Sequence, residues 1–258
     1  MASPAQTIWS RSYTAAKPFS VETEDGVRLE GSRVGDRGPS IVFCHGLLGW
    51  HRKPKIVRFV TALARSFVVY AVDLRGHGES EGLCTYGDLE VLDVDAVARL
   101  ARHERPGEPV ATVGTSMGGV AVVRHAALRG GVDAVVSIST PARWDGHTSR
   151  AVRQMQWVTG TPRGRRLAER LGVRLSDRWD SPPTPEDLVE RIAPTPLIVV
   201  HGRDDHFFDE EEAWRLYRRA GEPKRLLLAS RFGHADDGLT PGLAERLEPR
   251  IREALSLR

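Results

Sequence analysis

The fold of this chain is decided by the stretch Gly114-Thr115-Ser116-Met117-Gly118. Residues 109–113 before it form a short apolar, β-branched run that predicts a buried strand. Residues 119–128 after it are small and apolar with helical spacing, and they predict a helix. A serine between a strand and a helix, with glycine on both sides, is typical of a turn so tight that larger neighbours would clash. Ser116 is therefore a candidate nucleophile at the start of a helix whose first amides face developing negative charge.

A serine hydroxyl needs a general base, and that base needs a further group to fix its tautomer. Residues 196–202 predict a buried strand that runs into Arg203-Asp204-Asp205. Residues 225–229 predict another strand, and Gly233-His234 follows it. Open α/β sheets place their ligands beyond the carboxyl ends of their strands. We therefore expect an acid from the first loop and His234 from the second to lie near the serine.

The oxyanion of such a reaction would need backbone donors. Residues 40–44 predict a strand, which ends at His45-Gly46-Leu47-Leu48-Gly49. Gly46 allows the backbone to come close to a substrate, so the amide of Leu47 is expected beside that of Met117. These two amides are the candidate oxyanion hole.

With these motifs in place, the chain resembles an α/β-hydrolase. Members of that family carry H-G-x-x-G after the third strand and D-x-R-G-H-G-x-S after the fourth, which here are His45–Gly49 and Asp73–Ser80. They carry G-x-S-x-G after the fifth strand, G-x-x-D after the seventh and G-H after the eighth. The similarity runs from about residue 19 to the C-terminus, with a gap at about 141–183. The set is specific for the fold and much less so for the substrate.

The resemblance implies a role for each matching residue. Ser116 is the implied nucleophile, His234 the general base and acid, and Asp205 the orienting carboxylate. The motif places the acid three residues after the glycine, which from Gly202 gives Asp205. Asp204 competes for this role, and Asp145 is a remoter candidate because some hydrolases place the acid after the sixth strand.

Strands and helices alternate after residue 40, which predicts a mostly parallel eight-stranded sheet with helices on both faces. Strands are expected at 19–23, 28–34, 40–45, 67–72, 109–114, 134–139, 196–201 and 225–229. Helices are expected at 54–64, 88–104, 116–129, 186–192, 209–220 and 242–256. The first two strands, separated by Asp25-Gly26, are predicted to form an antiparallel hairpin at one edge. The motifs depend on one another, so residues 1–258 are predicted to form one catalytic domain.

The composition of the chain limits the kinds of partner that the protein is expected to bind. The net charge is only +3, and 33 of the 37 basic residues are arginine, with no grouping of basic and aromatic residues typical of nucleic-acid binding. The two cysteines, Cys44 and Cys84, do not suggest a disulfide framework. No signal-peptide pattern and no apolar run long enough to span a membrane is present. The sequence thus predicts a cytoplasmic protein with no cofactor, no metal site, no nucleic-acid partner and no membrane span; it predicts no oligomeric state.

The insertion at about 141–183 is expected to be a small helical cap over the serine, with helices near 149–158 and 162–171. Trp144, Met155 and Trp157 are candidate substrate-binding residues on a pocket wall, although packing between cap and core is an equal alternative. Residues 143–178 contain nine arginines and three acidic residues. This excess predicts either a solvated helix face or a surface that attracts an anionic substrate or carrier.

A serine at position 116 argues against dehalogenase or epoxide hydrolase chemistry, because both need a carboxylate there. Transfer of an acyl group to water is the leading hypothesis, from carboxylic esters first, thioesters second and small amides third. An acyltransferase or a cofactor-free carbon–carbon bond hydrolase would use the same residues. A non-catalytic ligand-binding relative is a hypothesis of a different class, which the presence of Ser116, Asp205 and His234 disfavours.

Overall fold

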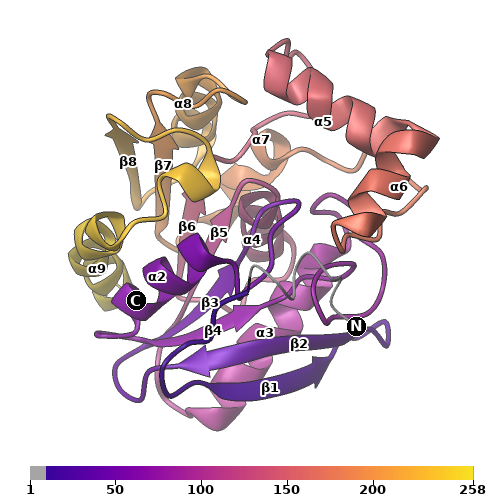
Figure 1. The fold of residues 1–258 in the computed structure, drawn as a ribbon. Coiled ribbons are helices and arrows are strands. Elements are labelled where there is room, and N and C mark those ends of the chain that lie inside the picture. Colours follow the sequence, from indigo (N-terminus) through magenta and orange to yellow (C-terminus); the bar gives the residue numbers. More distant parts are fainter. Residues whose placement is uncertain (1–9, 258) are drawn as a thin grey trace.

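The computed structural model describes residues 10–257 and contains one eight-stranded sheet (Figure 1). Its strands are β1 (Lys17–Glu22), β2 (Arg28–Val34), β3 (Ser40–Cys44), β4 (Val68–Val72), β5 (Val110–Thr115), β6 (Ala134–Ile138), β7 (Leu197–Gly202) and β8 (Lys224–Ala229). Their order is β1-β2-β4-β3-β5-β6-β7-β8, in which β2 pairs antiparallel with β1 and β4 while all later pairs are parallel. The predicted α/β class, the mostly parallel sheet and the edge hairpin are confirmed.

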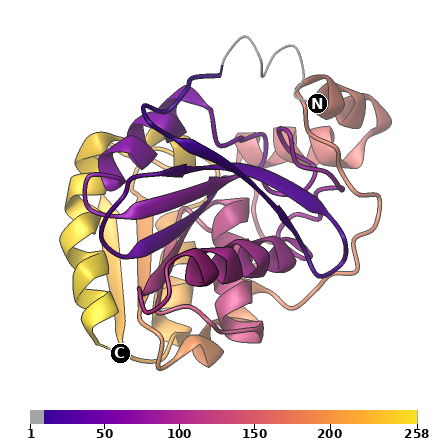
Figure 2. The ribbon, with the colours of Figure 1, turned by 90° about the horizontal axis from the view of Figure 1, so that it is seen from below.

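Helices cover both faces of the sheet, as Figure 2 shows from below. They are α2 (Pro54–Leu63), α3 (Glu90–Glu104), α4 (Met117–Leu128), α7 (Pro185–Leu188), α8 (Glu210–Arg219) and α9 (Pro241–Ser256). Side chains of α2 and α9 form one apolar core with one face of the sheet, and side chains of α3, α4 and α8 form a second core with the other face. Because both faces are covered, every residue of β3, β4, β5 and β6 is buried.

The helix predicted at 186–192 is two shorter elements. Thr184 and Asp187 form a capping box, in which each side chain accepts a hydrogen bond from the other residue's backbone amide, and α7 starts there. The backbone then tightens into the 3₁₀ helix η1 (Val189–Ile192). Pro194 follows closely and disfavours helical backbone at the residue before it, which ends the segment.

The segment between β6 and α7 carries two helices, α5 (Arg150–Gly160) and α6 (Pro162–Arg170), which stand at one corner of the molecule in Figure 1. Each helix has a side-chain cap: Ser149 accepts from the amide of Val152, and Thr161 accepts from the amide of Gly164. These helices agree with those expected at 149–158 and 162–171. That residues 1–258 form a single domain stays a prediction, and residues 1–9 and 258 lie outside the described part.

Candidate active site

Ser116 occupies the turn between β5 and α4 with a φ of 50°. Positive φ is unfavourable for a residue with a side chain, so the surrounding structure must enforce it. A Cβ atom on Gly114 would lie 2.2 Å from the carbonyl oxygen of Gly118, and one on Gly118 would lie 2.3 Å from that of Cys44. The two glycines flanking the serine are therefore required by contacts with backbone, as the motif predicts.

The loops after β7 and β8 bring an acid and a base to Ser116. The Ser116 hydroxyl lies 2.9 Å from Nε2 of His234, to which it can donate a hydrogen bond. On the other side of the ring, Nδ1 lies 2.8 Å from Oδ2 of Asp205 and 3.1 Å from Oδ1. A carboxylate cannot donate, so Nδ1 carries a proton and Nε2 is left free to accept. The three side chains form one hydrogen-bonded chain.

Asp205 is held as a carboxylate inside the protein. Its side chain is fully buried, and its Oδ1 accepts hydrogen bonds from the backbone amides of Phe207 and Phe208 at 2.8 and 3.1 Å. Burial alone would raise the pKa of Asp205, but the hydrogen bond to His234, the charge of that ring and the two amides together lower it. The competing residues Asp204 and Asp145 are both exposed, so the structure brings Asp205 to the histidine and neither of the alternatives.

The loop after β3 approaches the serine turn closely. A Cβ atom on Gly46 would lie 3.2 Å from that of Ser116. Within residues 10–257, the amides of Leu47 and Met117 donate to no protein acceptor, so both remain free to bind a ligand oxygen. The buried ring of His45 holds this loop: its Nδ1 donates to the carbonyl of Gly46 at 2.8 Å, and its Nε2 accepts from the amide of Leu74 at 3.1 Å. Burial lowers the pKa of His45, which keeps the ring neutral as this pairing requires.

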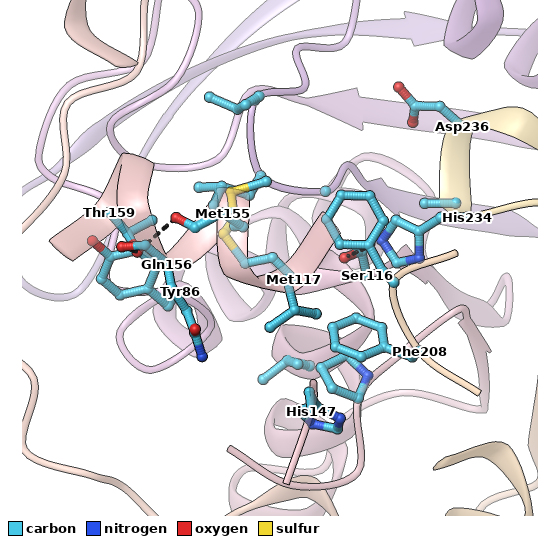
Figure 3. A pocket seen from close by; sticks show the side chains of 18 of the residues that line it. Tyr86, Ser116, Met117, His147, Met155, Gln156, Thr159, Phe208, His234 and Asp236 are labelled. Atoms are coloured by element: carbon cyan, nitrogen blue, oxygen red, sulfur yellow. Dashed lines mark hydrogen bonds between the residues drawn. The ribbon is translucent and has the colours of Figure 1, made fainter. Parts of the chain in front are cut away.

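A cavity of about 430 Å³ opens onto Ser116 and His234 (Figure 3). Four residues of α5, spaced three and four apart, line it from the cap side: Val152, Met155, Gln156 and Thr159. Trp144 and Met155 line the cavity as expected, whereas Trp157 does not line it and is 48% exposed. An α-helix turns about 100° per residue, so the side chain of Trp157 points about 200° away from that of Met155. Trp157 therefore faces outward.

The sequence of the chain matches a known family over the segment that carries this site. Residues 41–255 fit the model of the alpha/beta hydrolase family. The chain belongs to that family. Among curated relatives of this hydrolase, the uncharacterised protein YfhR of Escherichia coli K12 is 27% identical over 249 residues, which cover 90% of this chain and 78% of YfhR.

Solved structures share the hydrolase fold. The esterase Pf2001 of Pyrococcus furiosus superposes with a TM-score of 0.74 at 22% identity, covering 96% of each chain. Est1E of Butyrivibrio proteoclasticus, whose structure has ferulic acid bound, superposes with a TM-score of 0.67 at 19% identity, covering 92% of this chain and 99% of that one. At this level of identity the likeness shows the fold alone.

Two aromatic residues of the site were missing from the sequence-based prediction. The ring of Phe207 stacks at a tilt on that of His234, with centroids 4.4 Å apart and 32° between the planes. The ring of Phe208 meets the same imidazole edge-on at 5.4 Å. The pair directly follows Asp205-His206 in sequence, and this position was the available signal. These rings shield the hydrolase's histidine and limit its rotation.

Among the described residues of this hydrolase, no group of three or more His, Cys, Asp or Glu side chains is arranged to hold a metal ion. The same part of the chain has no helix that is both long and apolar enough to cross a membrane. His77 is buried, contacts the ring of His45 at 4.9 Å between centroids and has its pKa lowered to about 3, chiefly by burial. A neutral ring that packs against its neighbour is a structural element of the loop after β4.

Proposed function

We propose that this α/β hydrolase cleaves a carboxylic ester, or a thioester, through an acyl-enzyme formed on Ser116. The observation that carries the proposal is the hydrogen-bonded chain Ser116–His234–Asp205, with contacts of 2.9 and 2.8 Å. Nucleophile, base and orienting acid within hydrogen-bond reach are the arrangement that activates a neutral hydroxyl. Esterases among the structural neighbours support the same reaction class.

In the first step, the Ser116 hydroxyl attacks the carbonyl carbon of the substrate while Nε2 of His234 takes its proton. The resulting imidazolium donates a hydrogen bond from Nδ1–H to the carboxylate of Asp205. The carboxylate stabilises the positive charge of the ring, and the proton stays on Nδ1. The ring then gives the Nε2 proton to the departing alcohol or thiol. Water repeats the sequence on the acyl-enzyme, releasing the acid and regenerating Ser116.

The negative charge that forms on the carbonyl oxygen needs donors already in place. The amides of Leu47 and Met117 are the proposed pair, because both are free and both lie beside the serine turn. The amide of Met117 belongs to the first residue of α4, so the helix dipole adds to its effect. Removing one such donor typically costs about 10²- to 10³-fold in kcat.

The substrate proposed for this site is a small acyl compound, and the cavity bounds its size. Trp144 and Met155 are the proposed substrate-binding side chains, since both line the cavity that opens onto the serine. Trp157 is excluded from this role because it faces outward.

The test is hydrolysis of p-nitrophenyl esters from acetyl to dodecanoyl, with Ser116→Ala as the paired control. We expect turnover that disappears with the substitution, together with covalent labelling of the wild type alone by a fluorophosphonate. Equal inertness of both proteins towards the esters and the label would overturn the proposal and favour a ligand-binding role. Labelling without ester hydrolysis would instead move the search to thioesters and acyl transfer.

A further inference from the structure

The two faces of helix α5 carry different kinds of side chain. The face formed by Val152, Met155, Gln156 and Thr159 lines the cavity above Ser116. On the other face Arg150, Arg153 and Trp157 are exposed. The spacing of three and four residues within each set places each on one side of the helix, because an α-helix turns about 100° per residue.

Helix α6 presents a similar mixture to solvent. Arg163, Arg166, Leu167 and Arg170 share the spacing of one helical face, and all four are exposed. Leu167 is 41% exposed and adds an apolar side chain to this basic face. The two helices touch closely at their turn, where a Cβ atom on Gly164 would lie 2.3 Å from the carbonyl oxygen of Trp157. We call the following exposed residues of α5 and α6 the cap face: Arg150, Arg153, Trp157, Arg163, Arg166, Leu167 and Arg170.

Within the described residues, the arginines of the cap face form no ion pair, and Arg153 alone among them donates a side-chain hydrogen bond, to the carbonyl oxygen of Thr148. Of the nine arginines in residues 143–178, Arg143 pairs with Glu212 and Arg165 pairs with Asp177, while Arg174 donates to backbone carbonyls of the loop after β4. Within residues 10–257, the remaining six have no carboxylate partner: Arg150, Arg153, Arg163, Arg166, Arg170 and Arg178. Their charge therefore acts outward.

We propose that the cap face docks this protein on an anionic lipid surface. Arginines alone would suit any soluble anion, but Trp157 and Leu167 lie among them on the same helical faces. This combination matches a membrane interface, where guanidinium groups meet phosphate headgroups and an aromatic or aliphatic side chain enters the acyl boundary. The protein would lie on the bilayer, with no helix of its described part crossing it.

Docking in this way would place the cavity next to the lipid. The outer face of α5 would contact the headgroups while its inner face, through Met155 and Gln156, lines the space above Ser116. An acyl substrate leaving the bilayer would then have a short path to the site. The docking itself is independent of the proposed ester cleavage, because it concerns binding alone.

The experiment is co-sedimentation of the full chain with vesicles of phosphatidylcholine, with and without phosphatidylglycerol. We expect the wild type to sediment with the anionic vesicles only, and to be released by added salt. The double variant Arg163→Gln/Arg166→Gln should bind about thirtyfold more weakly, since each basic side chain near an anionic surface contributes about 1 kcal/mol. Trp157→Ala should also weaken binding, which attraction by charge alone would not predict.

The matched control is Arg246→Gln/Arg250→Gln, which removes the same charge from α9, on the other side of the molecule in Figure 1. Thermal melting verifies that each variant is folded, and fluorophosphonate labelling tests the proposed serine chemistry separately. Equal sedimentation of the wild type with both vesicle types would overturn the proposal, as would an equal loss in the α9 variant. Binding to heparin without binding to vesicles would assign the cap face to a soluble polyanion and reject the lipid surface.

Discussion

The serine turn and the cap are held in opposite ways. Nearly all of α4 is buried, from Met117 through Ala126, and its start is pressed against the backbone of the loop after β3. In contrast, α5 buries only Val152, and α6 buries only Gly164 and Ala168. Backbone contacts thus fix the proposed chemistry, whereas four side chains of the mostly exposed helix α5 line the cavity from the cap side. We therefore expect substitutions in α5 to change the proposed substrate preference without disturbing the serine turn beneath it.

The largest effect should come from the acid of the proposed triad. Asp205→Asn should reduce kcat about 10⁴-fold, because an amide favours the wrong tautomer of His234. Asp204→Asn is the matched control and should retain turnover, since its side chain is exposed. Ester hydrolysis by both variants checks this, and a greater loss in Asp204→Asn would move the acid by one position.

A methyl group added to each region should act in opposite directions. Gly118→Ala should lower the free energy of unfolding by about 3 kcal/mol, because its Cβ would meet backbone oxygens that cannot move away. In α5, Gly160→Ala has open space around the new atom, and should raise the free energy of unfolding by about 0.5 kcal/mol. Urea denaturation of the pair measures both changes. Equal destabilisation would contradict the contrast between turn and cap.

The pH dependence of the free energy of unfolding should differ between the buried carboxylate of Asp73 and an exposed one. Burial raises the pKa of Asp73, but the charge and hydrogen bonds of His51 outweigh this effect and lower it to about 2, against an ordinary value of 3.8. A lowered pKa stabilises the folded state above pH 3.8, and this contribution of about 2 kcal/mol is lost as the pH falls towards 2. The stability gap between wild type and Asp73→Asn should therefore narrow over this interval.

The control for that measurement is Asp187→Asn beside the cap. Hydrogen bonds from Thr184 lower the pKa of Asp187 as well, but this carboxylate is solvated. Its stability gap should be smaller at neutral pH and should depend less on acidification. Urea unfolding of the wild type and both variants between pH 3.8 and 2 measures these differences. A stability difference between wild type and Asp73→Asn that stays constant over this interval would refute the lowered pKa of Asp73.

The smallest effect should arise on the wall of the cavity. Met155→Ala should enlarge the space above Ser116 and shift the preferred p-nitrophenyl ester to a longer acyl chain, changing the ratio of kcat/KM values about tenfold. Gln154→Ala on the exposed face of the same helix should leave the chain-length profile unaltered. Identical profiles for all three proteins would show that α5 does not bind the acyl group.

Much of this molecule was predictable because it depends on local chain order. Each parallel strand is a short apolar run followed by a loop, so the strands were located to within about two residues. The resemblance to α/β-hydrolases selected Asp205, because the family motif places the acid three residues after the glycine that is Gly202 here. The orientation of Trp157 was also available from the spacing within α5, since Val152, Met155 and Thr159 mark the inner face.

Other features depend on segments that meet only in the folded protein. The rings of Phe207 and Phe208 contact His234 because β7 and β8 pair in parallel, with Gly202 opposite Ala229. The partner of Asp73 is His51, from the loop after β3, with 2.8 Å between Nδ1 and Oδ1. Chain separation carries no information about which loops converge. The first contact was signalled only by the position of Phe207 and Phe208 directly after Asp205-His206, and the second had no signal in the sequence.

The strand order has a consequence for heat inactivation. Ser116 follows β5, an interior strand, whereas His234 follows β8, the outermost strand of the parallel side, which is only partly buried. Fraying begins where strands have a neighbour on one side alone, so His234 would leave its position while the nucleophile stays folded. Turnover should then fade at temperatures where most of the sheet still protects its amides from hydrogen exchange. The temperature at which this protein loses activity would then depend on the stability of β8.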